Sequence, residues 1–249
     1  MNLILLEADE IDAAGAARLS GPRAVHALEV LKVSAGQSLR VGMVDGPRGT
    51  AIVQGIDGRS LDLTCAFEAT VPPRPRVDLL LAVPRPKVMR RLWAQLAALG
   101  VGRIVLTNAE RVERPYFDTH ILGPECYRPL LIEGLQQAQD TRLPEVSIHR
   151  RFKVLIEDDL EALCGKGLRL VADPEGSGSV GAAVRDHAGG DADGRVLLAV
   201  GPEGGWNRFE LNLLAAHGFS VASMGPRTLR TDTACLALLA LIHDALRRD

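Results

Sequence analysis

Aromatic side chains are scarce in this sequence, which holds two Trp, two Tyr and five Phe among 249 residues. Proteins that bind single strands of nucleic acid by stacking present several aromatic rings, so that class of surface is not expected here. Cysteine is scarce too, and Cys65, Cys126, Cys164 and Cys235 form no C-x-x-C pair. Their spacing argues against a zinc site and against a disulfide scaffold. The six histidines show no paired spacing either, so we expect no metal ligand among them.

Long apolar runs are absent as well. The longest, Ala234–Ile242, is far too short to cross a bilayer, which needs about 20 residues. The first residues lack a basic segment followed by an apolar core, so we expect no signal peptide and a cytoplasmic protein. The charges are nearly balanced, since the chain has 29 Lys and Arg and 31 Asp and Glu, which gives a net charge of −2. A uniformly basic nucleic-acid-binding surface is therefore excluded, although a local basic patch is not.

The composition is that of an ordinary globular protein, with 47% hydrophobic and 24% charged residues, and the length allows one or two domains. In the N-terminal part, short apolar runs at 38–44, 50–55 and 60–65 are separated by glycine-containing turns, which predicts a small antiparallel barrel. Residues 23–33 have apolar side chains at helical spacing. The proline-rich stretch 71–76 favours extended backbone and predicts a boundary between domains.

After this boundary, strand-like and helix-like segments alternate. The strand candidates are residues 77–83, 103–107, 145–148, 168–172, 195–200 and 219–223. The helix candidates are residues 87–99, 124–139, 154–164, 208–217 and 233–247. Strands that alternate with helices of this length are typical of an α/β fold whose mostly parallel sheet is covered on both faces. The sequence therefore predicts a small β-barrel domain in residues 1–71 and an α/β domain in residues 72–249.

Positive charge gathers between Arg74 and Arg114, where nine Lys and Arg face three acids. A run of charge is more often a solvated surface than a binding site. This run, however, straddles the predicted domain boundary and follows the first strand of the sheet, at the edge where open α/β sheets bind ligands. The phosphate backbone of a nucleic acid is the partner that suits such a patch.

The most informative segment is Leu197–Glu210, in which a buried strand leads into a loop that carries three glycines within Gly201–Gly205. Glycine allows positive φ angles and a close approach of the backbone to a ligand. Asn207 and Glu210 have the spacing of a capping box, which predicts that a helix begins there. The loop matches neither a dinucleotide-binding fingerprint nor a Walker A loop. A tight turn and a ligand-binding loop are both compatible with this pattern.

A second unit of the same kind follows, in which a strand leads into residues 224–230 and then into a helix. Thr231 or Asp232 is predicted to cap that helix. Arg227 and Arg230 lie in the loop, and two arginines that open a very apolar helix suggest more than a solvated surface. Because the helix is apolar on every face, we expect it to be buried on every face, in part against a second subunit.

These two glycine-proline motifs carry a resemblance to a known family. They read Val200-Gly201-Pro202-Glu203-Gly204-Gly205 and Met224-Gly225-Pro226-Arg227-Thr228-Leu229-Arg230-Thr231-Asp232-Thr233-Ala234. The pair resembles the SPOUT class of S-adenosylmethionine-dependent RNA methyltransferases, and within it the RsmE family, which makes N3-methyluridine in 16S rRNA of the small ribosomal subunit. Residues 26–46 are similar to the family's PUA-like N-terminal barrel, and Lys87 fits the lysine ahead of its second-domain helix.

The resemblance implies an RNA-binding PUA-like barrel followed by a parallel-sheet domain with a trefoil knot, a rare exception to the rule that chains do not thread loops. It further implies S-adenosylmethionine as cofactor, rRNA or the assembled 30S subunit as substrate, and a homodimer without metal. The residues expected to bind the cofactor are Leu106, Thr107, Val200, Gly201, Pro202, Glu203, Gly204, Gly205, Met224, Gly225, Leu229 and Thr231. Those expected to bind RNA are Arg74, Arg76, Arg85, Lys87 and Arg142.

Methyl transfer needs the methyl group aligned with the attacking nitrogen, and that nitrogen has to lose its proton. Arg230 is the residue that we expect to be catalytic, by holding the base or by stabilising negative charge on a uracil oxygen. Glu203 and Asp232 are weaker candidates for accepting the proton. On the substrate side the chain departs from the family, with Asp232 where Glu is usual and residues 136–140 in place of a Glu-Gln-x-x-Arg cluster. Those departures leave two alternatives open, a catalytically impaired RNA-binding or ribosome-assembly protein and a methyltransferase for another RNA base.

Overall fold

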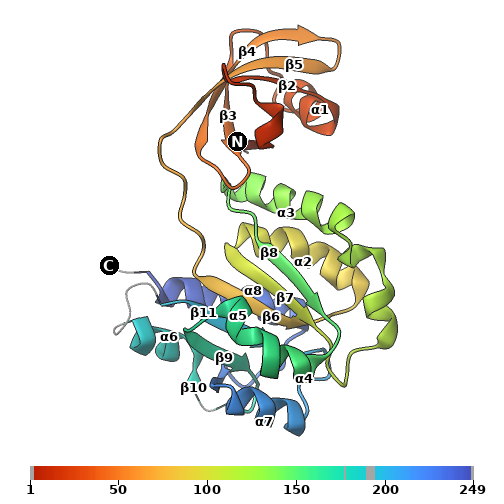
Figure 1. Ribbon diagram of the computed structural model, residues 1–249, viewed down its shortest axis with the longest axis vertical. Helices are drawn as coiled ribbons and strands as arrows, with labels where there is room; N and C mark the ends of the chain where they lie inside the picture. Colours follow the sequence, from red (N-terminus) through yellow and green to blue (C-terminus); the bar gives the residue numbers. More distant parts are fainter. Residues whose placement is uncertain (1–2, 177, 189–193, 248–249) are drawn as a thin grey trace. The chain divides into compact units, whose positions relative to one another are not determined.

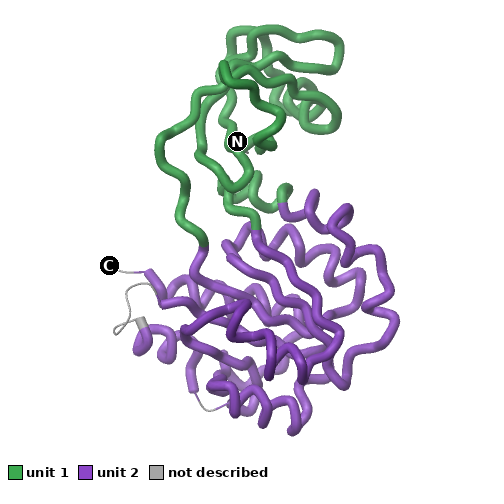
Figure 2. Tube along the Cα trace, in the orientation of Figure 1, with its two compact units in different colours: residues 1–74, 132–143 green, residues 75–131, 144–249 purple. Residues whose placement is uncertain are grey.

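The computed structural model describes residues 3–176, 178–188 and 194–247. The chain forms two compact units, which Figure 2 separates by colour. Unit 1 comprises Met1–Arg74 and Ile132–Leu143, and unit 2 comprises Pro75–Leu131 and Pro144–Asp249. The boundary expected after residue 71 lies close to the end of the first segment of unit 1. The sequence pattern gives no sign that residues 132–143 return to that unit.

Unit 1 is built on a curled five-stranded sheet with the strand order β1-β3-β4-β5-β2. Its strands are β1 (Ile4–Leu6), β2 (Ala16–Leu19), β3 (Ser38–Met43), β4 (Arg48–Asp57) and β5 (Ser60–Phe67). β1 pairs in parallel with β3, and the other neighbouring strands are antiparallel. Along β5, Leu61, Leu63 and Cys65 are buried while the residues between them are more exposed, which is the period of two expected for a half-buried strand. The predicted small barrel is confirmed as a curled half-barrel, with the parallel pair of β1 and β3 as a departure from the expected antiparallel pairing.

The helical parts of unit 1 are the 3-10 helix η1 (Ala8–Glu10) and the helix α1 (Gly21–Glu29). The helix predicted at residues 23–33 thus begins and ends earlier. Lys32 has a φ angle of 53°, a left-handed conformation that an α-helix does not continue through. Ala24 and Ala27 of α1 pack into the core of the barrel.

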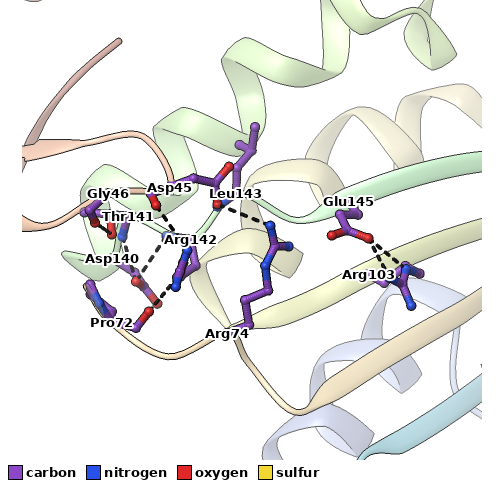
Figure 3. A network of polar contacts seen from close by, with 10 residues as sticks. All are labelled: Asp45, Gly46, Pro72, Arg74, Arg103, Asp140, Thr141, Arg142, Leu143 and Glu145. Carbon is purple, nitrogen blue, oxygen red and sulfur yellow. Dashed lines mark hydrogen bonds and ion pairs between the residues drawn. The ribbon is translucent and has the colours of Figure 1, made fainter. Parts of the chain in front are cut away.

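Residues 139–143 close unit 1 by bonding to the turn that follows β3 (Figure 3). The Thr141 hydroxyl donates to the Gly46 carbonyl at 2.6 Å, and the Asp45 N–H donates to the Thr141 carbonyl at 2.8 Å. Thr141 is fully buried, so its hydroxyl needs such a partner. These bonds explain why the segment belongs to the barrel although the helix before it begins in unit 2.

Unit 2 is built on a seven-stranded sheet with the order β10-β12-β9-β11-β6-β7-β8, in which every neighbouring pair is parallel. Its strands are β6 (Val77–Ala82), β7 (Val101–Thr107), β8 (Glu145–His149), β9 (Leu168–Ala172), β10 (Gly178–Ser179), β11 (Val196–Val200) and β12 (Phe219–Ser223). The central strands β6 and β11 are buried at every position because helices cover both faces of the sheet. The predicted parallel α/β domain is confirmed.

The other elements surround this sheet. The helices are α2 (Pro86–Ala98), α3 (Pro124–Ala138, which ends in unit 1), α4 (Phe152–Val154), α5 (Leu160–Cys164), α6 (Val180–Ala188), α7 (Arg208–Ala216) and α8 (Thr231–Ala245), with the 3-10 helices η2 (Arg114–Asp118) and η3 (His120–Leu122) and the π-helix η4 (Leu155–Asp159). α2 and α8 pack against each other on one face of the sheet, and the segment from α4 to α5 covers the other (Figure 1). Among the described residues, no helix is long and apolar enough to cross a membrane.

The start of α8 corrects the predicted cap. Arg230 occupies the N-cap position without a capping side-chain bond, and Thr231 is already helical. The Asp232 carboxylate instead accepts the Thr233 N–H at 2.9 Å. In the single chain Leu241 is 40% exposed, so the expected burial of that side of α8 against a second subunit stays a prediction.

Candidate functional site

A cavity opens in unit 2 at the carboxyl ends of β9, β11 and β12. It is lined by Ala172, Asp173, Pro174, Val200, Gly201, Pro202, Glu203, Gly205, Trp206, Ala222, Ser223, Met224, Gly225, Arg227, Thr228, Leu229, Thr231, Ala234 and Leu238. All strands of a parallel sheet end at the same edge, and this is the edge where α/β folds bind their ligands.

The cavity brings together most of the residues predicted to bind a cofactor. Nine of the twelve line it, namely Val200, Gly201, Pro202, Glu203, Gly205, Met224, Gly225, Leu229 and Thr231. Leu106, Thr107 and Gly204 do not. Leu106 and Thr107 are fully buried at the end of β7, which is separated from β11 by β6.

The first loop of the cavity follows β11 and turns tightly before α7. The Gly205 N–H donates to the Pro202 carbonyl at 2.8 Å, and Gly205 has a φ angle of 73°, which favours glycine. The predicted capping box is confirmed at the start of α7. The Asn207 side chain accepts the Glu210 N–H, and the Glu210 carboxylate accepts the Asn207 N–H, each at 2.8 Å.

The same loop is held by residues that follow β7. The Arg111 guanidinium donates to the Gly204 carbonyl, and a Cβ placed on Gly204 would lie 2.9 Å from the Arg111 Cδ. The Glu210 carboxylate, which is 3% exposed, also accepts the Glu110 N–H at 2.7 Å. Gly204 therefore makes room for Arg111, and the segment after β7 supports the loop instead of lining the cavity.

The second loop follows β12. Gly225 has a φ angle of 131°, which residues with a Cβ rarely adopt, and its N–H donates to the Ser223 hydroxyl at 3.1 Å. Arg227 and Thr228 line the cavity. Arg230, the predicted catalytic residue, does not line it and is exposed at the start of α8.

The two candidate proton acceptors have different surroundings. Glu203 lines the cavity, and its Oε1 accepts the Arg85 N–H at 3.4 Å and lies 3.9 Å from the Arg85 Nε. Asp232 lies outside the lining and forms an ion pair with Arg91 of α2 at 2.9 Å. Glu203 is therefore the better placed of the two to meet a reacting group.

Two of the residues predicted to bind RNA lie in unit 1 among polar contacts of their own (Figure 3). The Arg142 guanidinium donates to the main-chain carbonyls of Pro72 and Asp45. Arg74 lies 3.9 Å from the Asp45 carboxylate. The donors of Arg142 are thus directed at the protein's own backbone.

The other three lie in unit 2. The Arg76 guanidinium donates to the Leu246 carbonyl at 3.1 Å. Arg85 and Lys87 are exposed at the start of α2, which follows the carboxyl end of β6. Because β6 and β11 are parallel neighbours, Arg85 and Lys87 lie at the same edge of the sheet as the cavity.

Cys164 and Cys235 of unit 2 do not add a nucleophile. Burial raises the pKa of the Cys164 thiol to about 11 and that of the Cys235 thiol to about 12, so neither is a thiolate near neutral pH. Within the described part of the chain, no group of His, Cys, Asp and Glu side chains could hold a metal ion. The chemistry of the cavity rests on backbone groups, hydroxyls, Arg227 and the carboxylates of Asp173 and Glu203.

Five groups of wall residues were absent from the predicted cofactor-binding set. They are the end of β9 (Ala172, Asp173 and Pro174), the end of β12 (Ala222 and Ser223), the pair Arg227 and Thr228, the α8 residues Ala234 and Leu238, and Trp206. The first could have been found, because the predicted strand at 168–172 has to end at the same edge as its parallel neighbours. No pattern in the sequence indicates that Trp206 turns into the cavity wall.

Known proteins are similar to this chain in sequence and in fold. A family model described as an RNA methyltransferase domain matches residues 72–243. A ribosomal RNA small subunit methyltransferase E from Treponema pallidum is 31% identical and is matched over 97% of this chain and 90% of its own length. A second one, from Borreliella burgdorferi, is 24% identical over 95% of each chain. A ribosomal RNA small subunit methyltransferase E from Neisseria gonorrhoeae, crystallised with S-adenosylmethionine, superposes with a TM-score of 0.77 at 20% identity over 97% of each chain.

Proposed function

The chain belongs to the RsmE family of RNA methyltransferases, and from this premise we propose that it methylates N3 of a uridine in 16S rRNA. Methylation of small-subunit rRNA with S-adenosylmethionine as methyl donor is the activity of that family. The parallel-sheet unit and the curled N-terminal barrel fit the SPOUT and PUA-like domains expected from the sequence motifs.

One observation carries the proposal: the two motifs that resemble the family converge on a single cavity. The chemical character of this cavity wall suits S-adenosylmethionine, because the wall is largely apolar. Its polar groups include the hydroxyls of Ser223, Thr228 and Thr231 and the guanidinium of Arg227. A Cβ added to Gly225 would meet nothing within 4 Å, so the bare backbone leaves open space beside the loop. The residues present therefore fit this cofactor.

When bound, S-adenosylmethionine supplies an electrophilic methyl group on its sulfonium sulfur. The chain has to hold that group in line with the attacking nitrogen, and such alignment lowers a barrier by about 7–11 kcal/mol. The loops after β11 and β12 are assigned to this positioning. The shape of the loop after β11 is fixed by the capping box at Asn207 and by the bonds from Arg111 and Glu110.

Arg230 is assigned to the methyl acceptor. It is exposed between Leu229 and Thr231, which both line the cavity, so it lies where a base would approach from outside. A guanidinium there stabilises the negative charge that a uracil oxygen gains as N3 loses its proton. Glu203 is assigned as the proton acceptor, a role that contributes about 10²–10⁴-fold.

The RNA-binding residues are assigned in two groups. Arg85 and Lys87, exposed at the edge of the sheet, are assigned to phosphate contacts close to the reaction. Arg74 and Arg76, which flank the boundary between the two units in the sequence, are assigned to further phosphate contacts. Arg142 is assigned to holding unit 1 together, because its donors bond to main-chain carbonyls.

We also propose a homodimer in the cytoplasm, where small ribosomal subunits assemble. Leu236, Ala237, Ala240 and Leu241 of α8 are exposed or half-buried in the single chain. An apolar helix side of this kind is covered when a second copy packs against it.

Calorimetric titration with S-adenosylmethionine, followed by transfer of a radiolabelled methyl group to unmodified 30S particles and to naked 16S rRNA, tests the proposal. We expect binding of the cofactor and incorporation into at least one of the two RNA substrates. Binding without incorporation would favour the alternative of a catalytically impaired ribosome-assembly protein. Incorporation into a base other than uracil would favour the alternative methyltransferase, and no cofactor binding would refute the proposal.

A further inference from the structure

Trp206 has a ring nitrogen that the site described above leaves unused. Its side chain lies in the wall of the cavity and is 5% exposed. The nitrogen, Nε1, is buried and has no hydrogen-bond partner among the residues that the structure describes. Buried polar groups in folded proteins are paired in the great majority, so an unpaired one calls for an explanation.

Two neighbours fix the position of this indole. A Cβ added to Gly201 would lie 3.1–3.2 Å from three atoms of the indole, Nε1 among them, so the bare glycine backbone packs directly on the ring. The ring of Phe152 packs on the indole at a centroid distance of 5.3 Å. The N–H is therefore held in place before any ligand binds, and a donor that is already ordered loses little entropy on binding.

Trp93, the other tryptophan of the chain, has a different environment. It is fully buried in α2, and its Nε1–H donates to the Ile121 carbonyl at 3.1 Å. It also packs against the Tyr127 ring at a centroid distance of 5.0 Å. The chain thus pairs the indole that lies away from the cavity and leaves unpaired the one in the cavity wall.

We propose that the Trp206 N–H donates a hydrogen bond to bound S-adenosylmethionine, which makes Trp206 a cofactor-binding residue. The inference rests on the proposed function, because it requires that cofactor in this cavity. S-adenosylmethionine carries suitable acceptors in its adenine nitrogens, ribose oxygens and carboxylate. The nitrogen is closed to water in the ligand-free chain, so the cofactor reaches it only when the loop beside it moves as the cofactor binds.

Trp206→Phe tests this assignment, because it removes the donor and keeps an aromatic ring. We expect the affinity for S-adenosylmethionine, measured by calorimetry, to fall about five- to tenfold, the usual loss for one hydrogen bond. The melting temperature of the ligand-free variant should fall less than that of Trp93→Phe, because both substitutions leave a cavity but only the one at Trp93 also breaks a hydrogen bond. Trp93→Phe is the matched control. It loses a bond that is already made, so its ligand-free melting temperature should fall while its cofactor affinity stays unchanged.

A second readout follows the indole directly. With ¹⁵N-labelled tryptophan, the two variants assign the two indole N–H resonances, and saturating S-adenosylmethionine should shift that of Trp206 and slow its exchange with solvent. If Trp206→Phe fails to fold, a benzothienylalanine at position 206 keeps the ring shape without the N–H. Wild-type affinity in the substituted protein, or an unmoved Trp206 resonance at saturation, would overturn the inference and leave the proposed function standing. A wild-type protein that does not bind the cofactor would overturn both.

Discussion

Replacing Glu210 with Gln should weaken both the fold of unit 2 and the binding of the cofactor. The Glu210 carboxylate is 3% exposed and accepts two backbone N–H groups, from Glu110 at 2.7 Å and from Asn207 at 2.8 Å. Through these bonds it ties the start of α7 to the segment after β7. Gln keeps one acceptor oxygen but directs an NH₂ group at the second N–H, so one of the two bonds is lost.

The size of the effect follows from this geometry. A hydrogen bond to a charged group contributes about 1.5–3 kcal/mol, and at 3% exposure solvent replaces little of it. We therefore expect the free energy of unfolding to fall by about 2–3 kcal/mol, and the melting temperature by about 4–12 °C for a chain of this size. Because the loop from Gly201 to Trp206 is positioned by these bonds, the KM for S-adenosylmethionine should rise severalfold while kcat changes little.

Thermal unfolding and steady-state methyl transfer on the same preparation measure both effects. Glu110→Gln is the matched control. It makes the same chemical change at the residue bonded to Glu210, and it keeps the main-chain N–H that donates to the Glu210 carboxylate. A Glu210→Gln protein that melts with the wild type and keeps its KM would refute the view that this carboxylate sets the loop.

Arg230→Lys should keep the fold and the cofactor affinity but lower single-turnover methyl transfer by about 10²–10³-fold, and full activity would remove Arg230 from the reaction. Leu241→Glu should leave each chain folded, since the side chain is 40% exposed, and convert dimers to monomers in light scattering. A dimeric variant would refute the assignment of α8 to the interface. Arg85→Glu combined with Lys87→Glu should weaken rRNA binding and flatten its dependence on salt by about one to two units of the logarithmic slope. An unchanged slope would assign both residues to a solvated surface.

The sequence predicted an element correctly wherever its pattern of apolar residues is compatible with a single secondary structure. The continuous apolar runs of β6 and β11 could be read as central parallel strands because both faces of such strands are buried. Helix α6 could not be predicted, because its sequence places only Val180 and Val184 as large apolar residues and offers no stripe of the usual width.

The sequence predicted which loops form the candidate site, but it did not predict the role of each residue in them. A glycine pattern does not tell whether the space it leaves serves a ligand or a side chain, and at Gly204 that space is used by Arg111. Likewise, an apolar helix does not reveal which side faces outward. Leu238 is 2% exposed and lines the cavity, whereas Leu241, three residues further along α8, is 40% exposed. Both distinctions depend on contacts between segments that are far apart in the sequence.

The identity of the methylated nucleoside decides whether this protein methylates N3 of a uridine. Unmodified 30S particles would be incubated with the protein and S-adenosylmethionine that carries a deuterated methyl group, and the 16S rRNA would be digested to nucleosides for mass spectrometry. We expect the label in one nucleoside, which elutes with authentic N3-methyluridine and is absent when the protein is omitted. Label in any other nucleoside would contradict the proposed methylation of uridine N3. The absence of any label, with a protein that binds the cofactor, would contradict it as well.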